Sequence, residues 1–337
     1  MRVAVLAPIA WRTPPADYGP WEQVASLLTE GLVSAGVEVT LFATGDSRTT
    51  AALDWVAPRG YEVDRALDGR VWEALHVSHA LGRAADFDLV HNHLDWLPLA
   101  FAEHWPVPLL TTIHGFSGPG ILPAYQRAGG PYVSISDADR SPQLSYVATV
   151  HHGVDPDQLP FSATGGDDLV CLGRIHPDKG TAEAIDIAQR AGRRLVICGI
   201  VHDHSYFREH VLPRVDDERV VYLGSVGPRE RAEVLGRSAA LLHPVAFDEP
   251  FGLAVVESMM CGTPVVAFDR GAMPEVVDEG VTGYVVADTD EAVAAVARAA
   301  ALDRAVCHDV AAKRFSAQRM VHDYLEVYER VLSAASS

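Results

Sequence analysis

Two cations stand where they could neutralise a diphosphate. Arg174 and Lys179 belong to the segment LGRIHPDKG, which follows an apolar, strand-like run and precedes a helical one. Loops at the carboxyl edge of a parallel sheet commonly bind ligands. Lys179 and Lys313 are the only lysines in the chain, so a lysine in this glycine-bounded loop indicates a binding role. A solvated loop cation is the simpler alternative.

Two glutamates flank an expected helix start in the segment EPFGLAVVE. Residues 250–252 break the chain and Leu253 begins a helical pattern, so the first-turn N–H groups are unpaired and can hold phosphate oxygens. Glu249 precedes the helix, whereas Glu257 lies roughly 7–8 Å along its axis at about 1.5 Å per residue. The carboxylates can bind hydroxyls on either side of a phosphate, which fits a nucleoside diphosphate sugar, with Glu257 toward the ribose and Glu249 toward the sugar. Alternatively, Glu249 only favours the helix dipole and Glu257 is an exposed helix position.

Alternating strand and helix patterns would position these residues. Residues 2–9 are typical of a buried strand, 21–35 of an amphipathic helix and 37–43 of a second parallel strand, which together make a βαβ unit. A second alternating run begins near residue 168. The sequence therefore predicts an α/β fold with two Rossmann-like domains.

The two domains are predicted at residues 1–158 and 159–315. Proline and glycine cluster at 155–167, which indicates a linker. The last segment, 316–337, is expected to be a helix with one apolar face, which either caps the second domain or crosses back to the first. A length of 337 residues and a hydrophobic content of 48% are enough for two cores.

Composition excludes several classes of partner. The formal net charge of −18 disfavours nucleic acid and anionic lipid. Residues 1–158 hold nine Arg and Lys against eighteen Asp and Glu, so no basic face for membrane docking is expected. The chain shows neither a signal peptide nor a run of about 20 apolar residues, and it is expected to be cytoplasmic. Four widely separated cysteines indicate buried, reduced thiols.

No metal site is expected. The histidine pairs of HNH (91–93) and HDH (202–204) lack the cysteine or carboxylate that would complete a zinc set. Residues 137–139 read Asp-Ala-Asp, a pattern that can hold a metal, but they are expected to cap a helix. Diphosphate would instead be held by local cations and a helix amino terminus.

Several motifs in the chain resemble those of a known family. The stretch FDEPFGLAVVESMMCGTPVVAFDRGAMPEVVDEGVTGYVV resembles glycosyltransferase family 4, including the spacing of Glu249 and Glu257, and so does LGRIHPDKG. In the first half, GPWEQVASLLTEGLVSAGVEVTLFATGDS is similar to the opening βαβ unit of that family. FDLVHNH and LTTIHGF resemble a second signature pair, and HHGVD takes the place of the usual NGVD. The resemblance covers nearly the whole chain.

The resemblance implies a GT-B fold, in which two Rossmann-like domains face each other across a cleft, and transfer with retention and without metal or cofactor. By similarity Arg174 and Lys179 would neutralise the donor diphosphate, Glu257 would bind the ribose and Glu249 the donor sugar. Backbone groups at two further places would complete the donor site. The phosphates would meet Gly252, Leu253 and Ala254, and the base would meet Gly199, Ile200, Gly224, Ser225 and Val226.

The first domain would contribute His114 and Gly19. His114, in TIHGF, would face the reacting centre and offer a hydrogen bond or its backbone oxygen, so that His114 and Glu249 are the expected catalytic residues. The family usually has a glycine pair near the amino terminus, where this chain has Gly19-Pro20. Pro20 has no N–H to donate, so the phosphate contact of that loop would rest on Gly19 alone.

The donor is expected to be a nucleotide sugar, a UDP-sugar by resemblance, with GDP-mannose still possible. The segment GIVHDHSYFREHV is most similar to bacterial enzymes that glycosylate small molecules, which favours a soluble small-molecule or saccharide acceptor. Rival classes are a sugar-nucleotide epimerase, a phosphorylase and a non-catalytic nucleotide-sugar binding protein. Such phosphorylases commonly need a lysine that binds pyridoxal. This chain has only two lysines, one of which is already assigned to the diphosphate, so a phosphorylase is less favoured. The oligomeric state is left open.

Overall fold

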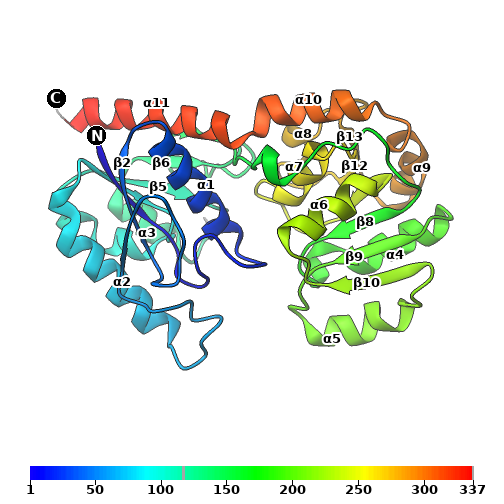
Figure 1. The fold of residues 1–337 in the computed structure, drawn as a ribbon, viewed down its shortest axis with the longest axis horizontal. Coiled ribbons are helices and arrows are strands. Elements are labelled where there is room, and N and C mark those ends of the chain that lie inside the picture. Colours follow the sequence, from blue (N-terminus) through cyan, green and yellow to red (C-terminus); the bar gives the residue numbers. More distant parts are fainter. Residues whose placement is uncertain (116–117, 336–337) are drawn as a thin grey trace. The chain divides into compact units, whose positions relative to one another are not determined.

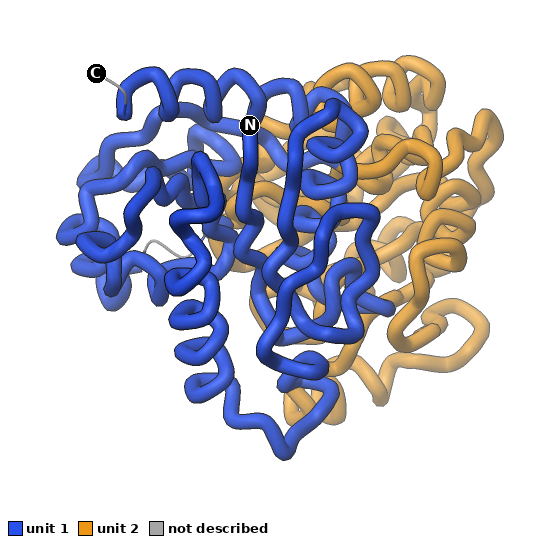
Figure 2. The backbone as a smooth tube through the Cα atoms, turned by 60° about the vertical axis from the view of Figure 1, so that its left-hand side comes forward, with its two compact units in different colours: residues 1–153, 317–337 blue, residues 154–316 orange. Residues whose placement is uncertain are grey.

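The computed structural model describes residues 1–115 and 118–335 and divides the chain into two compact units (Figure 2). Unit 1 comprises Met1–Gly153 with Ala317–Ser337, and unit 2 comprises Val154–Ser316. The chain therefore passes from one unit to the other after Gly153 and again after Ser316. The sequence had predicted these domain boundaries after residues 158 and 315. The expected linker at 155–167 lies inside unit 2, where the Arg304 Nε donates a hydrogen bond to the Ser162 carbonyl at 2.8 Å.

Unit 1 is a seven-stranded parallel sheet in the order β3-β2-β1-β4-β5-β6-β7. Its strands are β1 (Arg2–Leu6), β2 (Glu38–Ala43), β3 (Ala52–Trp55), β4 (Leu89–Asn92), β5 (Leu109–Ile113), β6 (Tyr132–Ser134) and β7 (Tyr146–Thr149). Its helices are α1 (Pro20–Ser34), α2 (Gly69–Arg83), α3 (Leu122–Ala128) and α11 (Ala317–Ala335), with a single helical turn at Ala84–Asp86 and a kinked helical segment at Leu97–His104. The central strands are buried because helices cover the sheet (Figure 1).

Unit 2 is a six-stranded parallel sheet in the order β10-β9-β8-β11-β12-β13. Its strands are β8 (Leu169–Leu172), β9 (Leu195–Cys198), β10 (Val220–Gly224), β11 (Ala240–His243), β12 (Val265–Phe268) and β13 (Gly283–Val286). Its helices are α4 (Thr181–Arg190), α5 (His204–Tyr206), α6 (Pro228–Arg237), α7 (Leu253–Met260), α8 (Met273–Val276), α9 (Thr289–Ala299) and α10 (Arg304–Phe315). Shorter helical turns lie at Pro156–Gln158, Pro177–Lys179, Phe207–Val211 and Leu212–Arg214. The prediction of two Rossmann-like sheets is confirmed.

Each sheet has a point at which its strand order reverses. In unit 1 the first strand, β1, lies between β2 and β4, and in unit 2 the first strand, β8, lies between β9 and β11. In open parallel sheets, ligands commonly bind at the carboxyl ends of the strands on either side of such a point. The loops after β8 and β11 carry the residues that the sequence singled out in unit 2.

Helix α11 completes unit 1 (Figure 1), which answers the question that the sequence left open. Its apolar face is buried, as the periodicity predicts, and it packs on α1. A side chain on Gly31 of α1 would place its Cβ 2.3 Å from Val321, so glycine permits the close approach. The Tyr328 hydroxyl lies 2.7 Å from the His91 Nδ1, and the Tyr324 hydroxyl lies 2.7 Å from the Thr112 Oγ1.

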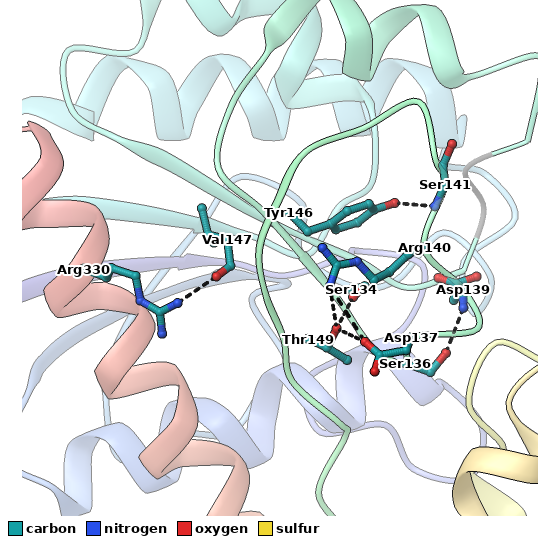
Figure 3. Close-up of polar contacts among 10 residues, drawn as sticks. All are labelled: Ser134, Ser136, Asp137, Asp139, Arg140, Ser141, Tyr146, Val147, Thr149 and Arg330. Atoms are coloured by element: carbon teal, nitrogen blue, oxygen red, sulfur yellow. Dashed lines mark hydrogen bonds and ion pairs between the residues drawn. The ribbon is translucent and has the colours of Figure 1, made fainter.

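The loop between β6 and β7 differs from its prediction (Figure 3). No helix follows residues 137–139, so the expected helix cap is wrong. Instead, Asp137 accepts a hydrogen bond from the Thr149 Oγ1 at 2.6 Å, and the Ser136 Oγ accepts one from the Asp139 amide at 3.0 Å. The Asp137 carboxylate thus holds the two ends of the loop together. In the same region Arg330 of α11 donates to the Val147 carbonyl at 2.8 Å.

Within residues 1–115 and 118–335, no helix has both the length and the apolar character needed to cross a bilayer.

Candidate active site

The loops after β8 and β11 pack closely against each other at Gly180. Gly180 has a φ of +66°, and a Cβ there would lie 1.9 Å from the Pro244 carbonyl oxygen, so another residue would force the two loops apart. The Ala246 amide donates to the Asp178 carbonyl at 2.8 Å across the same contact. These contacts bring Lys179, on one loop, to Glu249, on the other.

Lys179 and Glu249 form an ion pair, with the ammonium Nζ 2.5 Å from the Glu249 Oε2. The same ammonium lies 4.5 Å from the centre of the Phe247 ring, and the His243 Nε2 lies 3.4 Å from the Glu249 Oε2. Burial by itself raises the pKa of Glu249, but His243 and Lys179 outweigh it and lower the pKa to about 2. Glu249 is therefore ionised at every physiological pH. The sequence predicted both residues but not that they pair, and it gave no signal for His243.

The backbone of Glu249 is also fixed. Gly271, with a φ of +57°, lies close to this backbone. A Cβ on Gly271 would be 2.3 Å from the carbonyl oxygen of Glu249 and 2.5 Å from its amide nitrogen. The Ala272 amide donates to the Glu249 carbonyl at 2.8 Å. Gly271 and Ala272 thus fix the backbone of Glu249, while Lys179 and His243 contact its carboxylate.

The amino terminus of α7 lies three residues beyond Glu249 in the chain. Gly252 caps it with a φ of +92°, and a Cβ there would lie 2.6 Å from the Met273 Cε. The first amides that bond within the helix are those of Val255 and Val256, which donate to the Gly252 carbonyl. The amides of Leu253 and Ala254 have no partner among the described residues, and both residues are half-exposed, so these amides can donate hydrogen bonds to an anion.

Arg174 supplies a second cation on the loop after β8. Its side chain is half-exposed and forms no ion pair with any residue in the described part of the chain. A half-exposed guanidinium without a carboxylate partner is available to a bidentate phosphate contact.

Glu257, on α7, pairs with Arg231 of α6 at 3.2 Å. Burial raises the pKa of Glu257 above its ordinary value, and the nearby guanidinium opposes that shift. Glu257 is not an exposed helix position, which removes the simpler alternative for this residue. Arg231 is a site residue that sequence reasoning missed, because an arginine on an amphipathic helix gives no signal of its own.

The expected base-binding residues lie at neighbouring strand ends. Gly199 has a φ of +153°, and a Cβ there would lie 1.7 Å from the Gly173 oxygen, so only glycine lets the ends of β8 and β9 meet. The Gly199 amide donates to the Gly224 carbonyl at 2.8 Å, and Ile200 is half-exposed beside it. Ser225 is exposed, whereas Val226 is buried and offers little surface to a base.

In unit 1, His114 lies at the end of β5 in a chain of three buried imidazoles. The His93 Nδ1 lies 3.0 Å from the His114 Nε2, and the His114 Nδ1 lies 3.2 Å from the His152 Nε2. Both ring nitrogens of His114 are therefore engaged. While this chain is intact the imidazole has no free nitrogen for a sugar, and the backbone oxygen is the acceptor that the residue can still offer.

The three histidines are uncharged. Burial lowers the pKa of His93 and of His152 to about 3, and burial together with the neighbouring imidazoles lowers the pKa of His114 well below its ordinary value. A neutral imidazole has one donor and one acceptor nitrogen, so His114 donates to one neighbour and accepts from the other. Sequence reasoning missed His152 as a partner of His114, although HHGVD had drawn attention to it.

Gly19 precedes α1 with a φ of +152°, and a Cβ there would lie 2.9 Å from Pro15 and 3.0 Å from the Glu22 Oε2. Gly19 is buried, with Pro20 following as the first residue of the helix. The close packing explains why glycine is needed at this position. It also brings in Glu22, a buried carboxyl that the sequence analysis did not identify.

Glu22 predicts a pH dependence of stability. Burial raises its pKa from 4.5 to about 7, although hydrogen bonds from backbone amides, including that of Trp11 at 3.2 Å, act in the opposite direction. Between these pH values the folded chain keeps a proton that the unfolded chain loses. The contribution of Glu22 to stability is therefore fully present below pH 4.5 and is lost as the pH rises to about 7, by about 1.4 kcal/mol per pH unit.

Glu22→Gln mimics the protonated carboxyl and should remove the fall in the free energy of unfolding that Glu22 causes as the pH rises. We expect the variant to gain free energy of unfolding relative to the parent at pH 8 and to match it near pH 4.5. Urea unfolding at both pH values measures the difference, with the exposed Glu38→Gln as control. Equal slopes for parent and variant would contradict the assignment.

The described residues contain no group of three or more His, Cys, Asp or Glu side chains placed to hold a metal. His91 and His93 lie with ring centres 4.1 Å apart, but hydrogen bonds to Tyr328 and Thr112 occupy both nitrogens of His91. His202 meets His176 edge to face rather than His204.

Comparison with known proteins agrees with this arrangement. Residues 160–314 match the group 1 glycosyl transferases, and residues 22–154 match glycosyltransferase family 4. The chain is 31% identical over 307 residues to the D-inositol 3-phosphate glycosyltransferase of Mycolicibacterium smegmatis, which covers 71% of this chain and 68% of that protein.

Two solved structures share the fold over almost the whole chain. AviGT4, a glycosyltransferase involved in avilamycin A biosynthesis, has a TM-score of 0.75 and 25% identity, covering 99% of this chain and 98% of that one. HepE of Anabaena, in complex with UDP and glucose, has a TM-score of 0.73 and 16% identity, covering 98% and 100%. With both halves matched in order, the chain is a glycosyltransferase of the GT-B fold and belongs to glycosyltransferase family 4.

Proposed function

We propose that the chain transfers a hexose from a UDP-sugar to a hydroxyl of a small-molecule or saccharide acceptor, with retention at the anomeric carbon and without a metal ion. The observation that carries this proposal is the Lys179–Glu249 ion pair beside the open amino terminus of α7. It joins a cation for the diphosphate to a carboxylate for the sugar. UDP is preferred to GDP because HepE, which shares the fold, was solved with UDP and glucose.

The diphosphate gains negative charge as the bond to the anomeric carbon breaks. Fixed cations and unpaired amides stabilise such charge without reorganising, and they contribute most where water is excluded. In unit 2 these groups are Arg174, Lys179 and the amides of Gly252, Leu253 and Ala254. Lys179 has three N–H donors, so it can bind a phosphate oxygen while it still contacts Glu249.

The other groups hold the remaining parts of the donor. Glu257 binds the ribose hydroxyls, and Arg231 keeps its carboxylate in place. The strand ends at Gly199, Ile200, Gly224 and Ser225 line the base pocket. For unit 1 we carry over from the family resemblance a hydrogen-bond acceptor role for the His114 backbone oxygen and a phosphate-binding role for Gly19.

A donor panel tests the proposal. The full chain is mixed with UDP-glucose, UDP-galactose, UDP-N-acetylglucosamine and GDP-mannose, and its melting temperature and the release of nucleotide are recorded. We expect a UDP-sugar to raise the melting temperature and to be hydrolysed slowly without acceptor, and NMR should show that the released hexose first appears with the donor's anomeric configuration. Stabilisation by GDP-mannose alone would refute the UDP assignment, and inversion would refute retention.

Chelation should leave turnover nearly intact. Since Arg174, Lys179 and the α7 terminus neutralise the diphosphate, EDTA in excess over total divalent metal is expected to change the initial rate by less than about twofold. The rate is measured as nucleotide released per minute, with a zinc- or magnesium-dependent enzyme as the control for chelation. A large loss that Mg²⁺ or Mn²⁺ restores would overturn the metal-free mechanism.

Glu257→Gln should weaken donor binding and leave the chemical step almost unchanged. A carboxylate that holds the ribose acts equally in the ground and transition states, so its loss raises KM more than it lowers kcat. We expect the Kd for UDP to rise about tenfold by calorimetry, which corresponds to about 1.4 kcal/mol. Glu233→Gln, on the exposed face of α6, is the matched control. An unchanged Kd in Glu257→Gln would mean that the ribose lies elsewhere.

A further inference from the structure

A buried nitrogen beside Glu249 has no hydrogen-bond partner. It is the Nε2 of His243, the last residue of β11, whose side chain is 5% exposed. This atom lies 3.4 Å from the Glu249 Oε2, beyond the usual N–H···O range of about 2.7–3.2 Å, and it makes no hydrogen bond in the described part of the chain. Buried polar atoms in folded proteins usually have a partner. This nitrogen is therefore a candidate for an interaction that forms when a ligand binds.

The His243 Nε2 carries a proton. Glu249 is ionised because its pKa is lowered to about 2, and an ionised carboxylate can only accept hydrogen bonds. A nitrogen lone pair that faced this carboxylate would be repelled, whereas an N–H group is attracted to it. His243 thus has a donor that lies just beyond hydrogen-bond distance of Glu249.

Lys179 and His243 meet the same oxygen of Glu249. The Lys179 ammonium lies 2.5 Å from Oε2, which is also the atom nearest to His243. The other oxygen, Oε1, has no ion pair or hydrogen bond with any residue in the ranges 1–115 and 118–335. Oε1 is therefore the oxygen that can accept a hydroxyl of the donor sugar, and its direction depends on what holds Oε2.

A bound diphosphate changes the surroundings of Glu249. In the proposed function Lys179 contacts a phosphate oxygen, so its ammonium is shared between two anions. The phosphate also adds negative charge near Glu249, whose side chain is 11% exposed and has little water to offset the repulsion. A buried charge that loses part of its compensation is strongly destabilised. Glu249 then needs a second donor, and the His243 N–H is within reach.

We propose that His243 is a positioning residue, whose Nε2–H closes onto the Glu249 Oε2 when a diphosphate shares the Lys179 ammonium, and which thereby keeps Oε1 directed at the donor sugar. This inference rests on the proposed function, in which Lys179 meets the diphosphate and Glu249 the sugar. The backbone next to His243 is held in place, because a Cβ on Gly180 would lie 1.9 Å from the Pro244 carbonyl oxygen. The movement is therefore confined to side chains.

A double-mutant cycle measures this coupling. Calorimetry gives the Kd of the full chain for UDP and for inorganic pyrophosphate in the parent, His243→Phe, Glu249→Gln and the double variant. His243→Phe keeps a ring but has no N–H, and we expect it to raise both Kd values about fivefold. Glu249→Gln has no carboxylate charge to compensate, so adding His243→Phe to it should change Kd by less than about twofold. Equal effects in the two backgrounds would overturn the proposal.

A rescue variant and a control separate positioning from a structural role. His243→Gln restores an N–H donor and should return Kd to within about twofold of the parent. His308→Ala is the matched control, because the His308 Nδ1 bonds the Met260 carbonyl at 2.5 Å in the same unit. It should lower the melting temperature and leave both Kd values unchanged. If His243→Phe does the same, His243 is only structural and the proposal is wrong.

The N–H group can also be observed directly. In chain labelled with ¹⁵N-histidine, the Nε2–H proton of His243 is the imidazole signal that is missing from His243→Gln. Saturating pyrophosphate should move this signal downfield, because a charge-assisted hydrogen bond to Glu249 forms. Glu249→Gln should reduce the shift. A signal that stays in place in the parent would contradict the proposal.

These probes separate the role of His243 from the proposed function. If pyrophosphate binds with the expected coupling but no UDP-sugar is consumed, the proposed function fails and the role of His243 stands. If UDP-glucose is hydrolysed but the cycle shows no coupling, the role of His243 fails and the proposed function stands.

Discussion

Lys179→Ala is expected to lower kcat/KM for the sugar donor by about 10³-fold. Its ammonium is mostly buried and lies 2.5 Å from Glu249, so no water replaces it easily when a diphosphate must be neutralised. Loss of one preorganised group that stabilises transition-state charge costs about 10²–10³ in rate, and weaker donor binding adds to it. Initial rates of nucleotide release over a range of donor concentrations give the change in kcat and the change in KM separately.

The chain supplies its own control for this experiment. Lys313, the other lysine, is exposed on α10, so Lys313→Ala removes the same charge from the whole protein without touching the site. The Lys313→Ala enzyme should have the same kcat/KM for the sugar donor as the parent. Lys179→Arg keeps the charge and should recover part of the rate. A Lys179→Ala enzyme within threefold of the parent would show that the diphosphate is neutralised elsewhere.

Local signals in the sequence were enough to predict the two sheets and the loops of unit 2. Buried parallel strands are short apolar runs, and β1, β8, β9, β11 and β12 all read in this way. Glycines at strand and helix ends marked the loops, and Gly180 and Gly252 indeed have positive φ angles that other residues rarely adopt. Since Lys179 directly precedes Gly180 and Glu249 lies three residues before Gly252, sequence position alone brought them into the candidate site.

Contacts between distant segments could not be predicted in this way. Arg231 reaches Glu257 from another helix, and His152 reaches His114 across 38 residues, yet neither partner stands in a pattern that requires it. The destination of α11 was open for the same reason, because an apolar face indicates burial but not against which domain. The error at residues 137–139 has a different cause. Asp and Ser satisfy turns as readily as helix ends, and here the partner was Thr149 on the next strand.

The network around His114 changes what its substitution should do. Removing the imidazole leaves the His93 Nδ1 and the His152 Nε2 without their partner in a buried site, which costs about 1–3 kcal/mol for each unsatisfied group. It also frees the backbone at the end of β5 and removes the ring on which Trp21 stacks. We therefore expect His114→Ala to lower the melting temperature of the chain as well as its activity.

The two effects can be separated because the nucleotide is held by unit 2. His114→Ala should bind UDP within about twofold of the parent by calorimetry, while kcat per folded molecule falls by about 10²-fold, or roughly 2.7 kcal/mol of transition-state stabilisation. His152→Ala, which removes only the partner, should reproduce part of the kcat loss, since the carbonyl of His114 is then less well held. His308→Ala is the control, because the His308 Nδ1 bonds the Met260 carbonyl at 2.5 Å in unit 2, at the far end of α7 from Glu249. It should lower stability and leave kcat unchanged, and a His114→Ala enzyme that behaves in the same way would remove His114 from the reacting centre.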